Sequence, residues 1–375
     1  MANPMPTKSQ IQYLESKLHK QEDDNQRLLL LNKLGNHYTY TDVRKAQVFL
    51  SEMQEVLDRI GSDYVDFRLN YHWNSALIEN HLYNFNLSEF HFEDALKIVE
   101  DRGNANQQAE LYIDYAGTCL NLDQAALAEK YLTRARKLLD AFPDNRLEAR
   151  LSCREGFLNL QTRNLSKAVE LFLEADKQFD ALKVELDLKD YYFQTLIHSG
   201  LGKVYEDSDE PNKSIAPYLK VIEMCEQKNM RSRLSWHYLN VGNSYLAVSE
   251  DELAEKYFKK ALRSPDDNSQ QTRANAYANL GFCYFRNKKY DAALELYSRA
   301  EQLYKAKNEG DYGNFANVEI WRAYVNEELG RRKKALKHYF SALTYSKKTN
   351  DFRQMAGILR QIATFYADEG NFKDA

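Results

Sequence analysis

The chain has 375 residues, of which 43% are hydrophobic and 28% are charged, a balance typical of a folded chain and not of a disordered one. Its formal net charge is −4, from 51 basic and 55 acidic residues, so it lacks the basic excess that proteins use to neutralise nucleic-acid phosphates. Glycine (14) and proline (6) are scarce, which argues against a β-sandwich or barrel and favours long helices.

The N-terminal residues do not show the pattern that is typical of a targeting signal. Residues 1–7 have no apolar run, so we predict a disordered tail there and no signal peptide. Ile11, Leu14 and Leu18 share one helix face, which predicts an N-terminal capping helix over 8–27. The next apolar run, 28–31, is far shorter than the roughly 20 residues that span a bilayer. Four scattered cysteines without a CxxC pair fit a reducing compartment, so we expect a cytoplasmic protein that does not contact the membrane.

From residue 28 onward one pattern recurs: a small residue, another twelve later, an aromatic or Leu four further on, and a third small residue three after that. Gly281, Ala293, Tyr297 and Ala300 show the pattern in one unit. Small residues at these positions let two helices approach closely, and the aromatic fills the space beside them, so each unit predicts a helix pair. The first small residues of the successive units are Gly35 (an imperfect unit), Ala76, Ala116, Gly156, Gly202, Gly242, Gly281, Ala323 and Ala363.

The pattern is clearest in YLNVGNSYLAVSEDELAEKYFKKAL and YANLGFCYFRNKKYDAALELYSRA, where it resembles the tetratricopeptide repeat (TPR). The resemblance covers 28–375 and implies an all-α, right-handed superhelical α-solenoid of about eight units plus one truncated unit. Steps between complete units are 39 to 46 residues instead of 34, similar to lengthened repeats of bacterial regulatory TPR proteins. The largest step lies near 180–193. The last unit stops in the first turn of its second helix, so we expect the natural protein to continue beyond Ala375.

Signatures of catalysis and of metal binding are missing from the sequence. It has no HExxH or GxSxG motif, and the segment 199–203 lacks the leading glycine and the Ser/Thr of a phosphate loop. We therefore expect no enzyme activity, no cofactor, no metal and no nucleic-acid binding by this region.

The TPR resemblance implies that the first helices of successive units line a concave groove that holds a protein or peptide ligand. Asn side chains from adjacent helices can pair with the backbone of an extended peptide, because an amide both donates and accepts hydrogen bonds. Aromatic side chains add anchors of the kind that dominate interfaces. The alternative, that the Asn residues cap helices and the aromatics pack between repeats, stays open. The projected groove residues are Arg150, Arg154, Phe157, Trp236, Asn240, Asn243, Asn275, Asn279, Phe282, Arg286, Trp321 and Tyr324.

Asn243 and Asn279 also match two positions of the carboxylate clamp of some TPR proteins. The cations of that clamp are replaced by Leu239, Asn317 and Trp321, so we do not expect clamp function.

Three functions compete at this stage. The first is the sensory or regulatory region of a bacterial signalling protein with a C-terminal effector. The second is a peptide-pheromone receptor resembling the Rap group of Bacillus, although the register leaves little room for the N-terminal bundle of that group. The third is a stand-alone assembly adaptor or a self-associating array, and a homodimer is left open.

Overall fold

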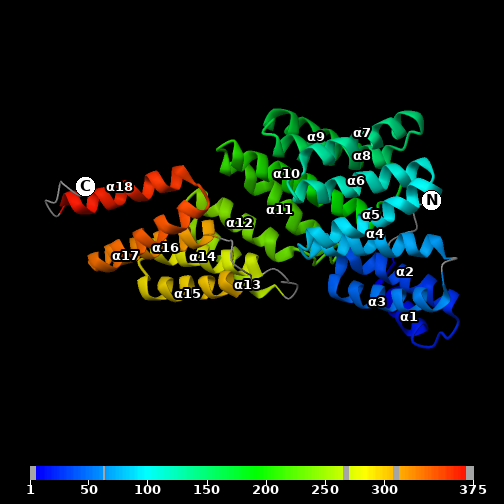
Figure 1. The fold of residues 1–375 in the computed structure, drawn as a ribbon, viewed down its shortest axis with the longest axis horizontal. Helices are drawn as coiled ribbons and strands as arrows, with labels where there is room; N and C mark the ends of the chain where they lie inside the picture. Colours follow the sequence, from blue (N-terminus) through cyan, green and yellow to red (C-terminus); the bar gives the residue numbers. More distant parts are fainter. Residues whose placement is uncertain (1–5, 62–63, 265–269, 307–311, 369–375) are drawn as a thin grey trace. The chain divides into compact units, whose positions relative to one another are not determined.

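The computed structural model describes residues 6–61, 64–264, 270–306 and 312–368 (Figure 1). The described residues form eighteen α-helices and no strand, which confirms the predicted all-α solenoid. The chain divides into two compact units, unit 1 (Met1–Leu234) and unit 2 (Ser235–Ala375), and each is described by itself. The predicted tail over 1–7 lies mostly outside the described residues, and the truncated end of the last unit, 370–375, lies wholly outside them.

The helices of unit 1 are α1 (Lys8–Leu18), α2 (Asp24–Thr41), α3 (Val43–Ile60), α4 (Val65–His81), α5 (Phe85–Arg102), α6 (Ala105–Asn121), α7 (Ala125–Ala141), α8 (Asn145–Gln161), α9 (Leu165–Asp180), α10 (Leu188–Asp207) and α11 (Pro211–Gln227). Those of unit 2 are α12 (Leu234–Ala247), α13 (Asp251–Arg263), α14 (Gln270–Arg286), α15 (Tyr290–Ala306), α16 (Tyr312–Glu328), α17 (Arg332–Lys348) and α18 (Phe352–Asp368). None of the described helices is long and apolar enough to cross a membrane.

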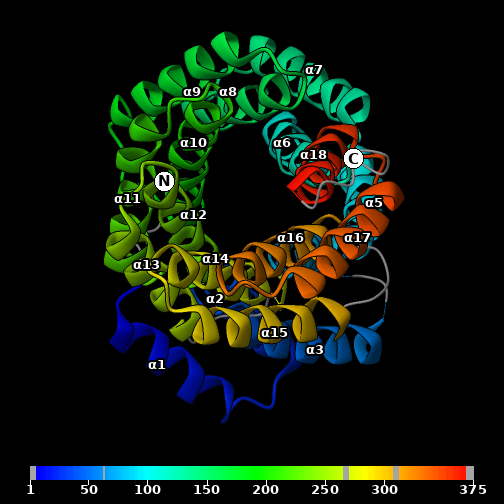
Figure 2. The ribbon, with the colours of Figure 1, turned by 90° about the vertical axis from the view of Figure 1, so that its left-hand side faces the viewer.

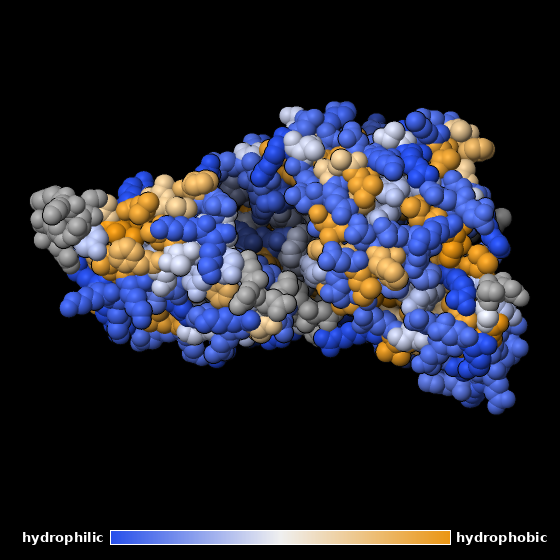
Figure 3. All heavy atoms as spheres, viewed as in Figure 1, coloured by the Kyte–Doolittle hydropathy of each residue, from blue (hydrophilic) through white to orange (hydrophobic). Residues whose placement is uncertain are grey.

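Within unit 1, each repeat is a helix pair, and successive pairs stack side by side from α2–α3 to α10–α11. Figure 2 shows α7 and α9 on the outer side of this stack and α8 and α10 on its inner side. The first helix of each pair therefore faces inward, as the TPR resemblance implied. On the face shown in Figure 3, hydrophilic residues predominate and apolar residues occur in separate groups.

The recurring small residues hold the pairs together. A Cβ atom added at Gly156 would lie 2.7 Å from the ring of Phe172, and one at Gly242 would lie 2.5 Å from the ring of Phe258. Both rings are fully buried. These contacts confirm that the small positions exist to admit an aromatic ring from the partner helix.

The turns inside the pairs share one backbone conformation. Seven residues after the first small residue, the chain takes a left-handed φ between 59° and 68°. A non-glycine residue adopts this conformation only at some cost, so its recurrence reflects the repeat and not the local residue type. The residues in this position are Tyr83, Asp123, Arg163, Asp209, Ser249, Lys288 and Gly330.

The insertion that the spacing predicted near 180–193 extends the first helix of its repeat. α10 has 20 residues and begins with a capping box, in which Asp187 accepts from the backbone N–H of Asp190. The extended start of α10 reaches α2, where the rings of Tyr192 and Tyr40 are 5.5 Å apart. The insertion thus joins the fifth helix pair to the first on the inner side of unit 1.

Candidate functional site

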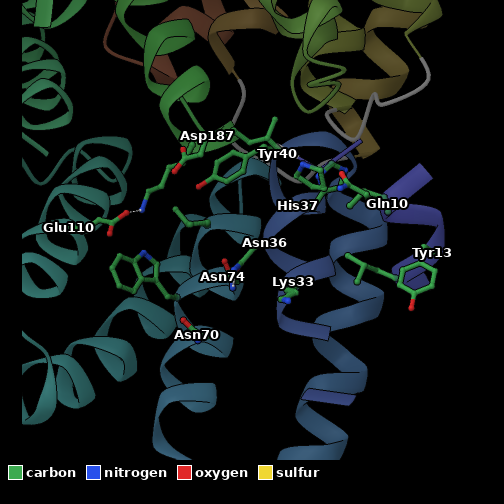
Figure 4. Close-up of a pocket in the computed structure, with 17 residues that line it drawn as sticks. Gln10, Tyr13, Lys33, Asn36, His37, Tyr40, Asn70, Asn74, Glu110 and Asp187 are labelled. Carbon is green, nitrogen blue, oxygen red and sulfur yellow. Dashed lines mark hydrogen bonds and ion pairs between the residues drawn. The ribbon is translucent and has the colours of Figure 1, made fainter. Parts of the chain in front are cut away.

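A cavity of about 760 Å³ opens on the inner side of unit 1, between α1, α2, α4, α6 and the start of α10 (Figure 4). In Figure 4, α1 supplies Gln10 and Tyr13 at one end, and Glu110 and Asp187 lie at the opposite end. The lining residues are Pro6, Gln10, Ile11, Tyr13, Leu14, Lys33, Asn36, His37, Tyr40, Asn70, Trp73, Asn74, Leu77, Glu110, Asp187, Leu188 and Lys189.

Asparagine amides occupy the middle of this cavity. Asn74 Nδ2 donates to Asn36 Oδ1 at 2.5 Å, and Asn70 lies one helical turn before Asn74 on α4. Each amide offers two donors and two acceptor sites, so one mutual bond leaves capacity for a ligand. Aromatic groups flank the amides, because Trp73 and Tyr40 also line the cavity. Polar groups that can pair with a peptide backbone thus lie beside apolar ring faces.

The acidic end of the cavity continues into a buried ionic cluster. Arg150 is 2% exposed and contacts three carboxylates: Glu110 at 2.7 Å, Asp190 at 2.5 Å and Asp187 at 3.4 Å. Lys189 extends the cluster into the cavity wall, with its Nζ 2.6 Å from Glu110. Figure 4 shows the Glu110 contact reaching across from α6.

Asp114 links this cluster to the aromatic wall. Its Oδ2 lies 2.5 Å from Lys189 Nζ and accepts from Trp73 Nε1 at 2.8 Å. Buried ion pairs of this kind fix geometry, because each partner would be costly to bury alone.

The charges of the cluster set its protonation. Burial alone would raise the pKa of Glu110, but the charges and hydrogen bonds of Lys189 and Arg150 lower it to about 2. For Asp190 burial dominates and raises the pKa, against the opposing effect of Arg150. Glu110 therefore stays ionised at neutral pH at the end of the cavity.

The predicted groove residues of unit 1 lie on α8. Arg150 and Arg154 are both buried, Arg150 in the ionic cluster and Arg154 with its guanidinium Cζ 4.9 Å from the ring centre of Phe193. Phe157 is partly buried and packs edge-on against Phe172 at 5.0 Å. None of the three lines the cavity.

In unit 2 the structure brings the predicted asparagines together. Asn279 Nδ2 donates to Asn243 Oδ1 at 2.7 Å. Asn275 accepts from the hydroxyl of Tyr304 at 2.7 Å and from Gln271 at 3.3 Å. Asn240 is partly buried on α12.

The other predicted residues of unit 2 also have neighbours. Phe282 and Trp321 lie 5.4 Å apart between ring centres, and Tyr324 stacks on Phe285 at 6.2 Å. Arg286 forms an ion pair with Asp251 at 3.1 Å. Trp236 is partly buried and lies against His237. These contacts fit packing between repeats, and they leave part of each of these aromatic surfaces accessible.

The cavity residues were missed although the register contains the signal. The predicted groove residues include the residue two positions before the first small residue of a repeat and the residue one position after it. In the first two repeats, these positions hold Lys33, Asn36, Asn74 and Leu77, and all four residues line the cavity. The pair Asn36–Asn74 of unit 1 therefore occupies the same repeat positions as the pair Asn243–Asn279 of unit 2. The register could not predict that Asp187 and Lys189 line the cavity, because these two residues belong to the insertion.

The described residues contain no group of three His, Cys, Asp or Glu side chains placed to hold a metal ion. The four cysteines are free and buried. Burial raises the pKa of Cys119, Cys153 and Cys283 to about 12, so these three thiols are poor nucleophiles.

Comparisons with known proteins agree with the repeat. The family model described as tetratricopeptide repeat matches residues 272–348, and the one described as 26S proteasome subunit RPN7 matches residues 89–197. A curated relative, anaphase-promoting complex subunit CDC16 of Saccharomyces cerevisiae, is 26% identical over 194 residues. That match covers 47% of this chain and only 22% of the relative.

Solved structures show the same fold along nearly the whole chain. The apo form of RapI has a TM-score of 0.57 at 14% identity and covers 96% of this chain and 94% of its own. A Rap protein complexed with competence and sporulation factor has a TM-score of 0.54 at 15% identity, covering 97% and 100%. A signal transduction ATPase with a tetratricopeptide repeat sensor from Pyrococcus horikoshii has a TM-score of 0.58 at 15% identity, covering 94% and 55%. The repeat register, the helix pairs and the match of residues 272–348 to the tetratricopeptide-repeat model show that the chain is built of tetratricopeptide-type repeats lengthened to about 40 residues.

Proposed function

We propose that the chain is a non-enzymatic binding scaffold that holds an extended peptide in the cavity of unit 1. The observation that carries this proposal is the set of amides from Asn36, Asn70 and Asn74 in a cavity of about 760 Å³. Cavities of this size accommodate a few residues of a ligand. The amides can pair with peptide N–H and C=O groups while Trp73 and Tyr40 pack against side chains.

The predicted groove residues of unit 2 form a second proposed contact surface. Asn243 and Asn279 stand in the same repeat positions as Asn36 and Asn74, and Phe282 and Tyr324 supply rings. Because both units combine an asparagine pair with aromatic rings, the chain can recognise two ligand segments independently.

We also propose a biological setting, a regulatory region of a cytoplasmic signalling protein of bacterial type. Binding would shift the equilibrium between arrangements of the helix pairs and so bias an effector, in the same polypeptide or in a separate one. The likeness to a Rap protein complexed with a factor and to a protein with a tetratricopeptide repeat sensor supports this setting.

A stand-alone assembly subunit is the second candidate. It is favoured by the match of residues 89–197 to a proteasome-subunit family and by the partial match to a subunit of the anaphase-promoting complex. In that case unit 1 would bind a segment of a neighbouring subunit and not a free peptide.

The test is affinity selection from a pool of random heptapeptides, with retained peptides identified by mass spectrometry. The double variant Asn36→Ala/Asn74→Ala should lose a class of peptides that the wild type retains. The matched variant Asn243→Ala/Asn279→Ala should keep that class, because its substitutions lie in unit 2. Retention of no peptide by the wild type, or equal losses in both variants, would contradict the proposal.

A further inference from the structure

Arg154 is a buried cation without a counter-ion among the residues that the structure describes. Arg154 is 8% exposed, and its Nε atom is buried without a hydrogen-bond partner among the described residues. In the part of the chain that the structure describes, its guanidinium forms no ion pair or hydrogen bond. An arginine cannot avoid the cost of a buried charge by losing its proton, since the guanidinium group stays charged in proteins.

The contrast with Arg150 shows that this is not a general feature of the region. Arg150 lies one helical turn earlier on α8 and reaches three carboxylates. Both arginines lie against the ring of Phe193, with Cζ at 5.5 Å for Arg150 and 4.9 Å for Arg154. The same helix therefore presents one neutralised guanidinium and one that is desolvated but not neutralised.

The surroundings of Arg154 hold its guanidinium in place. The ring of Phe193 supports it, and Gly117 of α6 leaves the space that it fills. A Cβ atom at Gly117 would lie 2.5 Å from Cζ and 2.7 Å from both terminal nitrogens of Arg154. A guanidinium fixed in this way presents its donors in a set direction, which suits bidentate pairing with a carboxylate.

This guanidinium is connected to the cavity by the repeat itself. Lys33 and Asn74 line the cavity at the position two before the first small residue, and Asp114 and Arg154 continue that row in the next two repeats. On α10, Phe193 follows Lys189 of the cavity wall by one turn. Asp114 and Arg154 do not line the cavity itself, so a ligand would reach Arg154 by extending along this row beyond the cavity wall.

We propose that Arg154 binds a carboxylate of the peptide held in unit 1, and that the ligand is therefore acidic at this one position. The proposal rests on the proposed function of the cavity. The carboxylate comes from an Asp or Glu side chain or from the C-terminus of the peptide. Asp114, whose Oδ1 is buried and has no hydrogen-bond partner among the described residues, is the group that would accept from an N–H of the same ligand.

The experiment repeats the affinity selection with two heptapeptide pools, one with free C-termini and one amidated. Wild-type protein is expected to enrich an acidic group at one position at least tenfold over the starting pool. Enrichment of Asp or Glu in both pools identifies a side chain, and enrichment only in the free-acid pool identifies the C-terminus. Arg154→Gln should abolish the acidic preference.

Gly117→Ala is the second variant, because it keeps the arginine and displaces its guanidinium. It should also remove the preference, and Arg154→Lys should keep a weakened one. Circular dichroism melting accompanies each variant, and only folded proteins are compared.

Three outcomes would overturn the inference in different ways. If the wild type retains peptides with no acidic preference, the Arg154 site is wrong and the cavity proposal stands. If the wild type retains no peptides, both fail together. A drop in melting temperature for Arg154→Gln with an unchanged acidic preference would assign Arg154 to an internal ion pair instead.

Discussion

Arg150 of α8 and Asp190 of α10 form an ion pair 2.5 Å long between residues that lie 40 positions apart and are almost fully buried. This pair joins two consecutive first helices on the inner side of unit 1. The insertion makes it possible, since Asp190 lies in the extended start of α10. A segment that looks like a loop insertion in the sequence is therefore part of the framework behind the candidate site.

The first prediction separates the two buried arginines by their effect on stability. Arg150→Leu leaves Glu110, Asp187 and Asp190 with too little positive charge and should lower the free energy of unfolding by about 3–5 kcal/mol. Arg154→Leu removes a buried charge that has no counter-ion among the described residues and should be neutral or stabilising. Hydrogen exchange of peptides from α8 and α10 measures both effects.

The control for this comparison is the wild type at the same pH and salt concentration. A loss of protection with Arg154→Leu as large as that with Arg150→Leu would mean that Arg154 has an internal partner in solution.

The second prediction concerns acid. Burial lowers the pKa of His81 from 6.5 to about 3, and the charges of Arg233 and Arg154 act in the same direction. The unfolded chain takes up this proton below pH 6.5 while the folded chain does not, so stability falls as the pH falls from 6.5 toward 3. Between pH 6.5 and 5 the loss from His81 alone should approach about 2 kcal/mol.

Glu110 extends the acid effect to lower pH. Its folded pKa of about 2 lies below the ordinary 4.5, so its contribution is present above pH 4.5 and is lost between pH 4.5 and 2. Urea unfolding at several pH values measures both windows. His81→Gln should reduce the loss of stability between pH 6.5 and 3 and leave the loss below pH 3, which comes from Glu110, unchanged. An unaltered slope above pH 4.5 in His81→Gln would refute the assignment.

The third prediction tests the packing role of the small positions. Gly202→Ala puts a Cβ atom 2.6 Å from the buried ring of Tyr218 and should destabilise unit 1 by about 1–3 kcal/mol. Gly357→Ala on α18 is the matched control, since among the described residues no side chain and no atom of another helix lies within 4 Å of its Cβ position. There the higher helix propensity of alanine should stabilise the helix by up to about 1 kcal/mol. Equal effects at both glycines in denaturant unfolding would argue against ring packing.

Much of the fold could be predicted because each repeat encodes it locally. The small residue and the aromatic that fills the space beside it, such as Gly242 and Phe258, specify a helix pair without long-range information. The candidate site depends on contacts that the register does not contain. Tyr192 meets Tyr40 only because the stack of helix pairs curves enough to bring α10 to α2. That curvature is the sum of many small packing angles, which the sequence pattern leaves undetermined.

For the asparagines as well, the repeat pattern predicts which residues are neighbours but not the cavity that surrounds them. The register placed Asn243 and Asn279 next to each other, and the structure has them hydrogen-bonded. The same two positions in the first two repeats hold Asn36 and Asn74, which are likewise hydrogen-bonded. Their cavity also needs α1 and Asp187 as walls, and neither follows from the repeat.

The last prediction uses the equivalence of the two asparagine pairs. Asn243→Ala with Asn279→Ala removes one mutual hydrogen bond, with a net worth of about 1 kcal/mol, so the melting temperature should fall by no more than a few degrees. Binding should suffer far more, because an extended peptide loses amide partners that solvent cannot replace in a partly buried groove. The double variant should lose a class of selected peptides that Asn36→Ala/Asn74→Ala retains. Loss of folding in the unit 2 variant would instead assign the pair to packing between repeats, and the aromatic contact of Phe282 with Trp321 would then belong to the same packing.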